Sequence, residues 1–255
     1  MSERSGTLSS LPEWQAAGLR LTAFPGVPSG ISGEAWWEEV VGQPPEQTTR
    51  QRSGEVQVVG LLGSGKLVLS IDLVRIDWRL LSVEEGLTLS DSVASLGTFS
   101  QTIEEFLSLM SKWLDSREHE VNRLAFGAEL LLPVENHSDG YRHLSSYLHS
   151  VNLDPEGSSD FLYQINRSRV SQTGVSDLRI NRLTKWSVGK LGRIVLLPNG
   201  HIMELAGAER YFCRLELDIN TAQDFNGTLP RDKLVVVFQE LVDLSKEIAM
   251  KGDVP

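Results

Sequence analysis

The sequence contains a single cysteine, Cys213, among its 255 residues. A lone thiol excludes a disulfide framework and a zinc site built from cysteines. No apolar run reaches the roughly 18–20 residues that a membrane-spanning helix needs. The first residues, Met1 to Gly6, also lack the apolar stretch of a signal peptide. We therefore expect a cytoplasmic protein that makes no membrane contact.

Basic residues are outnumbered, with 24 Lys and Arg against 34 Asp and Glu, so the formal net charge is −10. Because phosphate binding needs a basic footprint, this balance argues against a protein coated in nucleic acid. The hydrophobic fraction of 40% is that of an ordinary globular protein and excludes wholesale disorder. The length suits one large domain or two halves of roughly 100–150 residues.

The hydrophobic pattern predicts an α+β protein made of two similar halves. After a polar, flexible lead-in over residues 1–17, residues 18–116 read as a strand, a helix, three strands and a long helix. Residues 121–250 show the same order of elements, although no residue identity links the halves. Each half has too few strands to hide both faces of a sheet. We therefore expect curved antiparallel sheets joined into one compact unit, with the long helices on one side and the other side open.

Local signals refine this prediction at several positions. Thr98 and Gln101 have the spacing of a capping box before a helix at 100–115, and Ser32 and Ser138 are suited to cap two shorter helices. Neighbouring residues on a helix differ by about 100°, so only one of Trp36 and Trp37 is expected to face the core fully. Strands are expected at 19–24, 55–59, 67–71, 75–81, 121–134, 160–170, 177–188 and 202–219, with a last helix after residue 230.

Residues 60–67, Gly-Leu-Leu-Gly-Ser-Gly-Lys-Leu, resemble a phosphate-binding loop. In that motif a Ser or Thr that binds magnesium follows the lysine, but here Leu67 stands at that position. A strand pattern follows instead of a helix, so the dipole and free backbone donors that hold phosphate are missing. We expect a hairpin turn here.

No other group of residues predicts a catalytic or metal site. His143 and His149 are six residues apart, whereas zinc-binding pairs on helices are four apart. Glu216 and Asp218 share one face of a strand and could act as an acid and base, but Arg214 beside them favours neutralisation. Cys213 is expected to be a buried thiol. The remaining histidines, His119, His137 and His201, have no ligand spacing either, so we assign no catalytic residue, no metal and no cofactor.

The most unusual segment is the basic ribbon, which we define as residues 161–193. It has seven basic residues against one acid, a charge of +6, so the remainder of the chain carries −16. If it forms a hairpin, its arginines and aromatic rings share one face. The candidate partner-binding residues are Tyr163, Arg167, Arg169, Arg179, Arg182, Lys185 and Trp186.

Three interpretations of the basic ribbon remain open. Its charges could pair with the acidic remainder of the same chain. Arginine and aromatic side chains together are typical of protein–protein hot spots. They are also used to bind single-stranded nucleic acid, by phosphate attraction and base stacking. The acidic remainder would repel a long duplex, so we favour a protein partner over nucleic acid.

Several short motifs in the second half carry a family resemblance. Val121-Asn-Arg-Leu-Ala-Phe-Gly127 follows an amphipathic helix and precedes a helix over 141–148. Leu215-Glu-Leu-Asp-Ile-Asn220 then leads, through Asp224-Phe225, to a final helix that contains 241–248. Over residues 99–250 the chain resembles a sporadically distributed bacterial family of uncharacterised proteins. It departs from that family near Ala128, where the family has an arginine, and at Leu131-Leu132, where the family has Asn-Arg.

The resemblance implies origin in a mobile or defence-related locus but transfers no activity and no catalytic residue. Taken with the basic ribbon, it predicts a non-enzymatic protein that binds a protein partner from a bacterial defence, antitoxin-like or immunity-type locus. Two alternatives stay open: an enzyme for small molecules or nucleotides that uses the concave sheet face, and a single-stranded nucleic-acid binder. Association into a homo-oligomer is also left open.

Overall fold

The fold was analysed in a computed structural model, which describes residues 13–26, 33–83, 94–117, 120–192, 194–196, 202–204 and 209–254. The first half contains β1 (Gln15–Pro25), α1 (Gly33–Val41), β2 (Gln47–Arg50), β3 (Val56–Leu62), β4 (Gly65–Ile71), β5 (Ile76–Ser82) and α2 (Phe99–Asp115). The second contains β6 (Val121–Val134), α3 (His137–Tyr147), β7 (Leu162–Asn166), β8 (Arg169–Val170), β9 (Arg179–Leu191), β10 (Ile194–Leu196), β11 (Ile202–Glu204), β12 (Arg210–Thr221), a 3-10 turn (Arg231–Lys233) and α4 (Leu234–Lys251).

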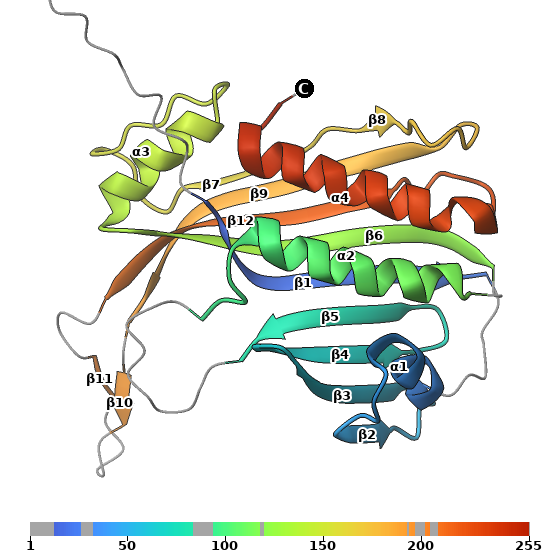
Figure 1. The fold of residues 1–255 in the computed structure, drawn as a ribbon. Helices are drawn as coiled ribbons and strands as arrows, with labels where there is room; N and C mark the ends of the chain where they lie inside the picture. The colour runs from blue at the N-terminus through green and yellow to red at the C-terminus, as the bar shows by residue number, and fades with distance from the viewer. Residues whose placement is uncertain are drawn as a thin grey trace, which may run out of the picture.

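Ten of the described strands form one antiparallel sheet, in the order β2-β3-β4-β5-β1-β6-β12-β9-β7, with β8 also paired to β9 (Figure 1). The central neighbours β1 and β6 are the first strands of the two predicted halves. The α+β class and the antiparallel sheet are therefore confirmed. That the halves repeat one another stays a prediction. Four strands follow α1 rather than three, because the short, polar β2 has no hydrophobic alternation to signal it. In the second half six described strands follow α3 rather than three, because residues 167–168 separate β7 from β8 and β10 pairs with β11 in a small sheet of their own.

The helices pack on one face of this sheet. Figure 1 shows α2 and α4 side by side across the central strands, while α1 lies over β3 and β4, and α3 over β9 and β12. Alternation in the strands explains this arrangement: in β1, Leu19 and Leu21 face the helices, and Arg20 between them faces away. We call the side without helices, over the described part of the chain, the open face.

Aromatic side chains hold the helices to the sheet. Phe126 of β6 lies between α2 and α4, with its ring centroid 6.5 Å from that of Phe106 and 6.1 Å from that of Phe238. The expectation that only one of Trp36 and Trp37 faces the core is wrong, because both are buried. Two partners make this possible: Trp37 stacks on Trp78 of the sheet, and Trp36 meets Trp113 of the neighbouring helix α2.

Several element boundaries differ from the predictions. β1 begins at Gln15, inside the predicted lead-in. Thr98 precedes α2, but its side chain makes no capping hydrogen bond, so the capping box does not form. The cap of α3 is Asn136 rather than Ser138, because the Asn136 side chain accepts a 2.9 Å hydrogen bond from the Asp139 amide. The predicted cap Ser32 lies outside the described residues. Where residues are described, every helix is too short or too polar to span a bilayer.

Candidate functional site

The basic ribbon forms the antiparallel pair that its alternation predicts, and Tyr163 of β7 lies opposite Trp186 of β9. The shared face, however, is the face that carries the helices. Trp186 is 0% exposed, and its ring lies 5.7 Å from that of Tyr147 and 6.0 Å from that of Trp14. Its indole nitrogen donates to the Thr184 hydroxyl at 3.0 Å. The expectation that this ring points outward is therefore wrong, because Tyr147 of α3 and Trp14, the residue before β1, cover it.

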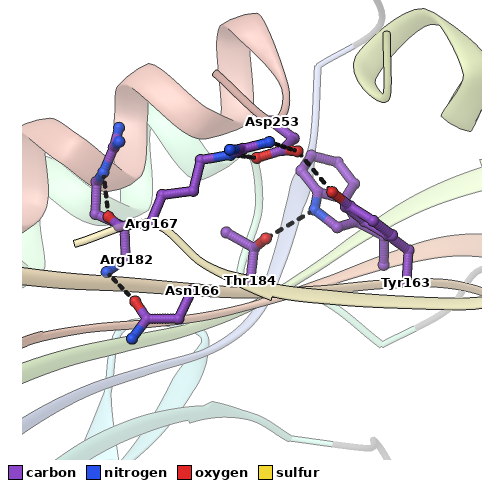
Figure 2. Close-up of polar contacts among 7 residues, drawn as sticks. Tyr163, Asn166, Arg167, Arg182, Thr184 and Asp253 are labelled. Atoms are coloured by element: carbon purple, nitrogen blue, oxygen red, sulfur yellow. Dashed lines mark hydrogen bonds and ion pairs between the residues drawn. The ribbon is translucent and has the colours of Figure 1, made fainter. Parts of the chain in front are cut away.

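Arg167 is paired within the molecule (Figure 2). Its Nε and one terminal nitrogen donate to the two carboxylate oxygens of Asp253 at 2.5 and 2.8 Å, and the Tyr163 hydroxyl donates to the same carboxylate at 2.8 Å. Asp253 follows α4 and is buried. The hydrogen bonds from Arg167, and then from Tyr163, hold the pKa of Asp253 below its ordinary value. These contacts attach the end of the described chain to the sheet.

Arg182 lies beside this cluster and is 4% exposed. Its Nε donates to the Arg167 carbonyl at 2.9 Å, and its backbone amide donates to the Asn166 side chain at 3.0 Å (Figure 2). Burial, and then the positive charge of Arg169, lower the pKa of the Arg182 guanidinium. Arg182 therefore supports the packing of the sheet rather than projecting into solvent.

The remaining predicted residues of the ribbon face different ways. Arg169 lies 3.6 Å from Glu247 of α4, and Lys185 lies 3.0 Å from Glu216 on the open face. Arg179 is exposed, and its Nε donates to the Ser168 hydroxyl at 3.3 Å. Arg167, Arg169 and Lys185 therefore form ion pairs within the chain, which is one of the three interpretations of the basic ribbon. A role of the seven residues in partner binding stays a prediction.

The open face contains a groove of about 500 Å³ that crosses the centre of the sheet. It extends from β5 over β1, β6, β12 and β9 to β7. Its floor includes two glycines, Gly18 and Gly127. Its charged lining consists of Arg20, Arg79, Glu129, Lys185, Glu216 and Asp218. The sequence prediction included only Lys185 among its partner-binding residues, although Glu216 and Asp218 were considered as a carboxylate pair.

Two arginines on neighbouring strands line one side of the groove, and their guanidinium groups extend in opposite directions, that of Arg20 over Gly127 of β6 and that of Arg79 towards Ser70 of β4. Arg20 of β1 and Arg79 of β5 are directly opposite in the antiparallel register. The Nε atoms of both are shielded from solvent and have no hydrogen-bond acceptor among the described residues. A terminal nitrogen of Arg79 donates a 3.3 Å hydrogen bond to the Ser70 hydroxyl of β4.

The acids at the other side of the groove are mostly neutralised. Glu216 lies 3.0 Å from Lys185 and 3.4 Å from Arg214, and Glu129 lies 2.9 Å from Arg214. Asp218 shares the face of Glu216, as its spacing predicts, and accepts a 3.1 Å hydrogen bond from Asn220. With its acids held in this way, the groove is suited to recognising charged groups by pairing.

The other candidate motifs have structural explanations. Residues 62–65 turn from β3 into β4, and a strand, not a helix, follows Lys66, which confirms the hairpin expected in place of a phosphate loop. Over the residues that the structure describes, no three His, Cys, Asp or Glu side chains gather into a possible metal site. His119 and His201 lie outside those residues.

Cys213 is a buried thiol, as predicted, and donates to the Gly140 carbonyl at 3.3 Å. Burial, and then the negative charge of Asp139, raise the pKa of this thiol to about 12. Since the thiolate is the reactive form, we expect iodoacetamide to modify native Cys213 at least about a hundredfold more slowly than the urea-unfolded chain at the same pH. Equal rates, measured by mass spectrometry, would contradict this assignment.

Sequence reasoning missed Arg20, Arg79 and Gly127. Alternation in residues 19–24 places Arg20 on the polar side of a strand, but it does not indicate which strand lies beside it. The pairing with Arg79 spans about sixty residues of chain and depends on the register between β1 and β5. Comparison of the chain with protein-family models and with curated proteins gave no match in either case.

Proposed function

We propose that this is a non-enzymatic binding protein whose open face receives a protein partner. The observation that carries the proposal is the groove at the centre of that face, which Arg20 and Arg79 line from neighbouring strands without an ion pair to any described acid. The described part of the chain supplies neither arginine with a counter-charge at ion-pair distance. Their retention is understandable if a partner neutralises them.

The edges of the sheet are poorly suited to the same task. A partner that adds a strand needs a long, regular edge with unpaired backbone groups. At one edge β2 has only four residues, all polar. At the other edge, β7 has five residues and the short β8 follows after a break at residues 167–168. We therefore place the interaction on the face of the sheet.

Charge favours a protein over nucleic acid as the partner. The groove brings Glu129, Glu216 and Asp218 close to its arginines, and the whole chain carries −10. A phosphate backbone would meet these acids along its length. A protein surface offers single charges of both signs and can complement such a lining. The resemblance to a family from defence-related loci makes the products of neighbouring genes the first candidates.

The test uses the double variant Arg20→Gln/Arg79→Gln in pull-downs with the product of each neighbouring gene. We expect at least a tenfold loss of affinity for the captured partner, because two central charge contacts disappear. The matched control is Arg52→Gln/Arg231→Gln, which removes two exposed charges elsewhere and should bind normally. Thermal unfolding of both variants shows whether the fold is intact.

Two results would count against the proposal. One is failure of every neighbouring product to bind the native protein. The other is equal binding by the groove variant and its control. Tight, strongly salt-dependent binding of a fluorescent single-stranded oligonucleotide, lost in the groove variant, would instead assign the open face to nucleic acid.

A further inference from the structure

We propose that Asn226 is a site of spontaneous modification, where the side-chain amide converts through a cyclic imide to aspartate and isoaspartate. Asn226 and Gly227 lie in the loop between β12 and the 3-10 turn, and both residues are exposed. A glycine after an asparagine favours this reaction, because glycine has no Cβ to shield its backbone nitrogen and adopts many backbone conformations. The modification does not depend on the proposed binding function.

The reaction uses only the chain and water. The Gly227 backbone nitrogen loses its proton and attacks the side-chain carbonyl carbon, Cγ, of Asn226, so that a new C–N bond closes an imide ring. The bond from Cγ to the side-chain nitrogen breaks, and that nitrogen takes up a proton and leaves as ammonia. Water then adds its hydroxyl to one imide carbonyl carbon and its proton to the ring nitrogen, and no oxidation or reduction takes place. Cleavage of the ring C–N bond at Cγ gives aspartate, and cleavage at the backbone carbonyl carbon gives isoaspartate.

The fold leaves both reacting groups of this pair unrestrained. Over the described residues, neither the Asn226 side chain nor the Gly227 backbone nitrogen has a hydrogen-bond partner. The side chains of five other asparagines form hydrogen bonds within the described chain: Asn122, Asn136, Asn166, Asn181 and Asn220. Asn152 is exposed like Asn226, but the side chain of Leu153 follows it and hinders attack by that backbone nitrogen. Among the described asparagines, Asn226 therefore combines exposure, a free side chain and a following glycine.

The loop is anchored on either side of the reacting pair. On one side, the Phe225 ring packs against the hydrophobic core. On the other side, Leu229 is buried, and its backbone amide donates to the Val121 carbonyl at 2.8 Å. The rotation that brings the Gly227 nitrogen to the Asn226 Cγ is therefore confined to exposed residues between these anchors, and local motion of such a loop does not require unfolding of the core.

The experiment incubates the native protein at mildly alkaline pH in water enriched in the heavy oxygen isotope, and peptide mass spectrometry follows residue 226. The reference is the peptide acetyl-Ala-Gln-Asp-Phe-Asn-Gly-Thr-Leu-amide, which has the sequence of residues 222–229 without the fold. We expect native Asn226 to convert at a rate within about tenfold of the peptide's rate, because the fold restrains neither reacting group. Both products should carry one heavy oxygen from the solvent and change the net charge of the protein from −10 to −11.

Two variants test the route of the reaction. Asn226→Gln has a longer side chain that closes an imide ring far less readily, so we expect no detectable conversion. Gly227→Ala shields the attacking nitrogen and should convert at least about tenfold more slowly than the wild type. Because a Cβ at position 227 would lie 3.2 Å from the Phe225 ring, the Gly227→Ala change is also made in the peptide, which lacks the packed fold. Circular dichroism shows whether both protein variants keep the native fold.

Three results would overturn the modification site. A native rate more than about tenfold below that of the peptide, including no conversion, would mean that the fold holds the reacting pair apart. Equal rates in Gly227→Ala and the wild type would exclude attack by the Gly227 nitrogen. The sequence contains a second Asn-Gly pair, Asn199-Gly200, which lies outside the described residues, and conversion there with Asn226 intact would likewise reject the assignment.

Discussion

Replacement of Trp186 by alanine is expected to lower the free energy of unfolding by about 3–5 kcal/mol, the cost of truncating a fully buried aromatic residue. Trp186 is 0% exposed and packs against two rings. One is that of Trp14, the residue before β1, and the other is that of Tyr147 in α3. The loss of Trp186 leaves a cavity at the point where three elements meet, and it also removes the indole donor of the Thr184 hydroxyl. Urea unfolding followed by circular dichroism measures the change.

The control is Leu162→Ala on the adjacent strand β7. Leu162 is 58% exposed, so its truncation should change the free energy of unfolding by no more than about 0.5 kcal/mol. A Trp186→Ala protein of native stability that no longer bound its partner would reverse our assignment. Trp186 would then contact the partner, as the sequence pattern predicts, and would not be part of the core.

The Asp253→Asn variant is expected to lose about 2–3 kcal/mol of stability near neutral pH, the range for hydrogen bonds to charged groups. Asp253 is buried and accepts hydrogen bonds from Arg167 and Tyr163. The neutral amide keeps the shape of the carboxylate but can no longer form the bidentate ion pair with Arg167. Arg167 then loses its counter-charge at the point where the end of α4 meets the sheet.

The pH dependence of this loss has a definite sign. Arg167 and Tyr163 lower the pKa of Asp253 in the folded protein below its ordinary value of 3.8. The stabilisation is therefore fully present above that ordinary value and is lost as the pH falls through the lower, folded value. We expect wild type and Asp253→Asn to differ by a constant amount well above pH 3.8 and to converge as the pH falls through the lower pKa of the folded protein.

Urea titrations of both proteins across this pH range measure the effect. The matched control is Glu209→Gln, which breaks the exposed pair with Lys190, where solvent screens the charges and the change in stability should be small. A stability difference between wild type and Asp253→Asn that did not change with pH would contradict the role of the ionised Asp253 carboxylate.

Local patterns in the sequence were sufficient for the class of fold and for its main elements. The repeated apolar positions of residues 100–115 and of the last helix predict α2 and α4, because one helical face must be buried whatever it packs against. Alternation likewise predicts that Tyr163 and Trp186 share a face and that Glu216 and Asp218 share another. These properties depend on neighbours a few residues apart.

The direction of those faces and the partners across strands depend on contacts between distant segments. Alternation makes the two faces of a strand different, but tertiary packing decides which one is buried, and here Tyr147 of α3 and Trp14 cover the face that holds Trp186. The proximity of Arg20 to Arg79 and to Gly127 follows from the registers of β1 with β5 and β6. A shift of one residue in either register would exchange the faces, and no local propensity fixes it. The candidate groove is therefore a product of long-range strand pairing.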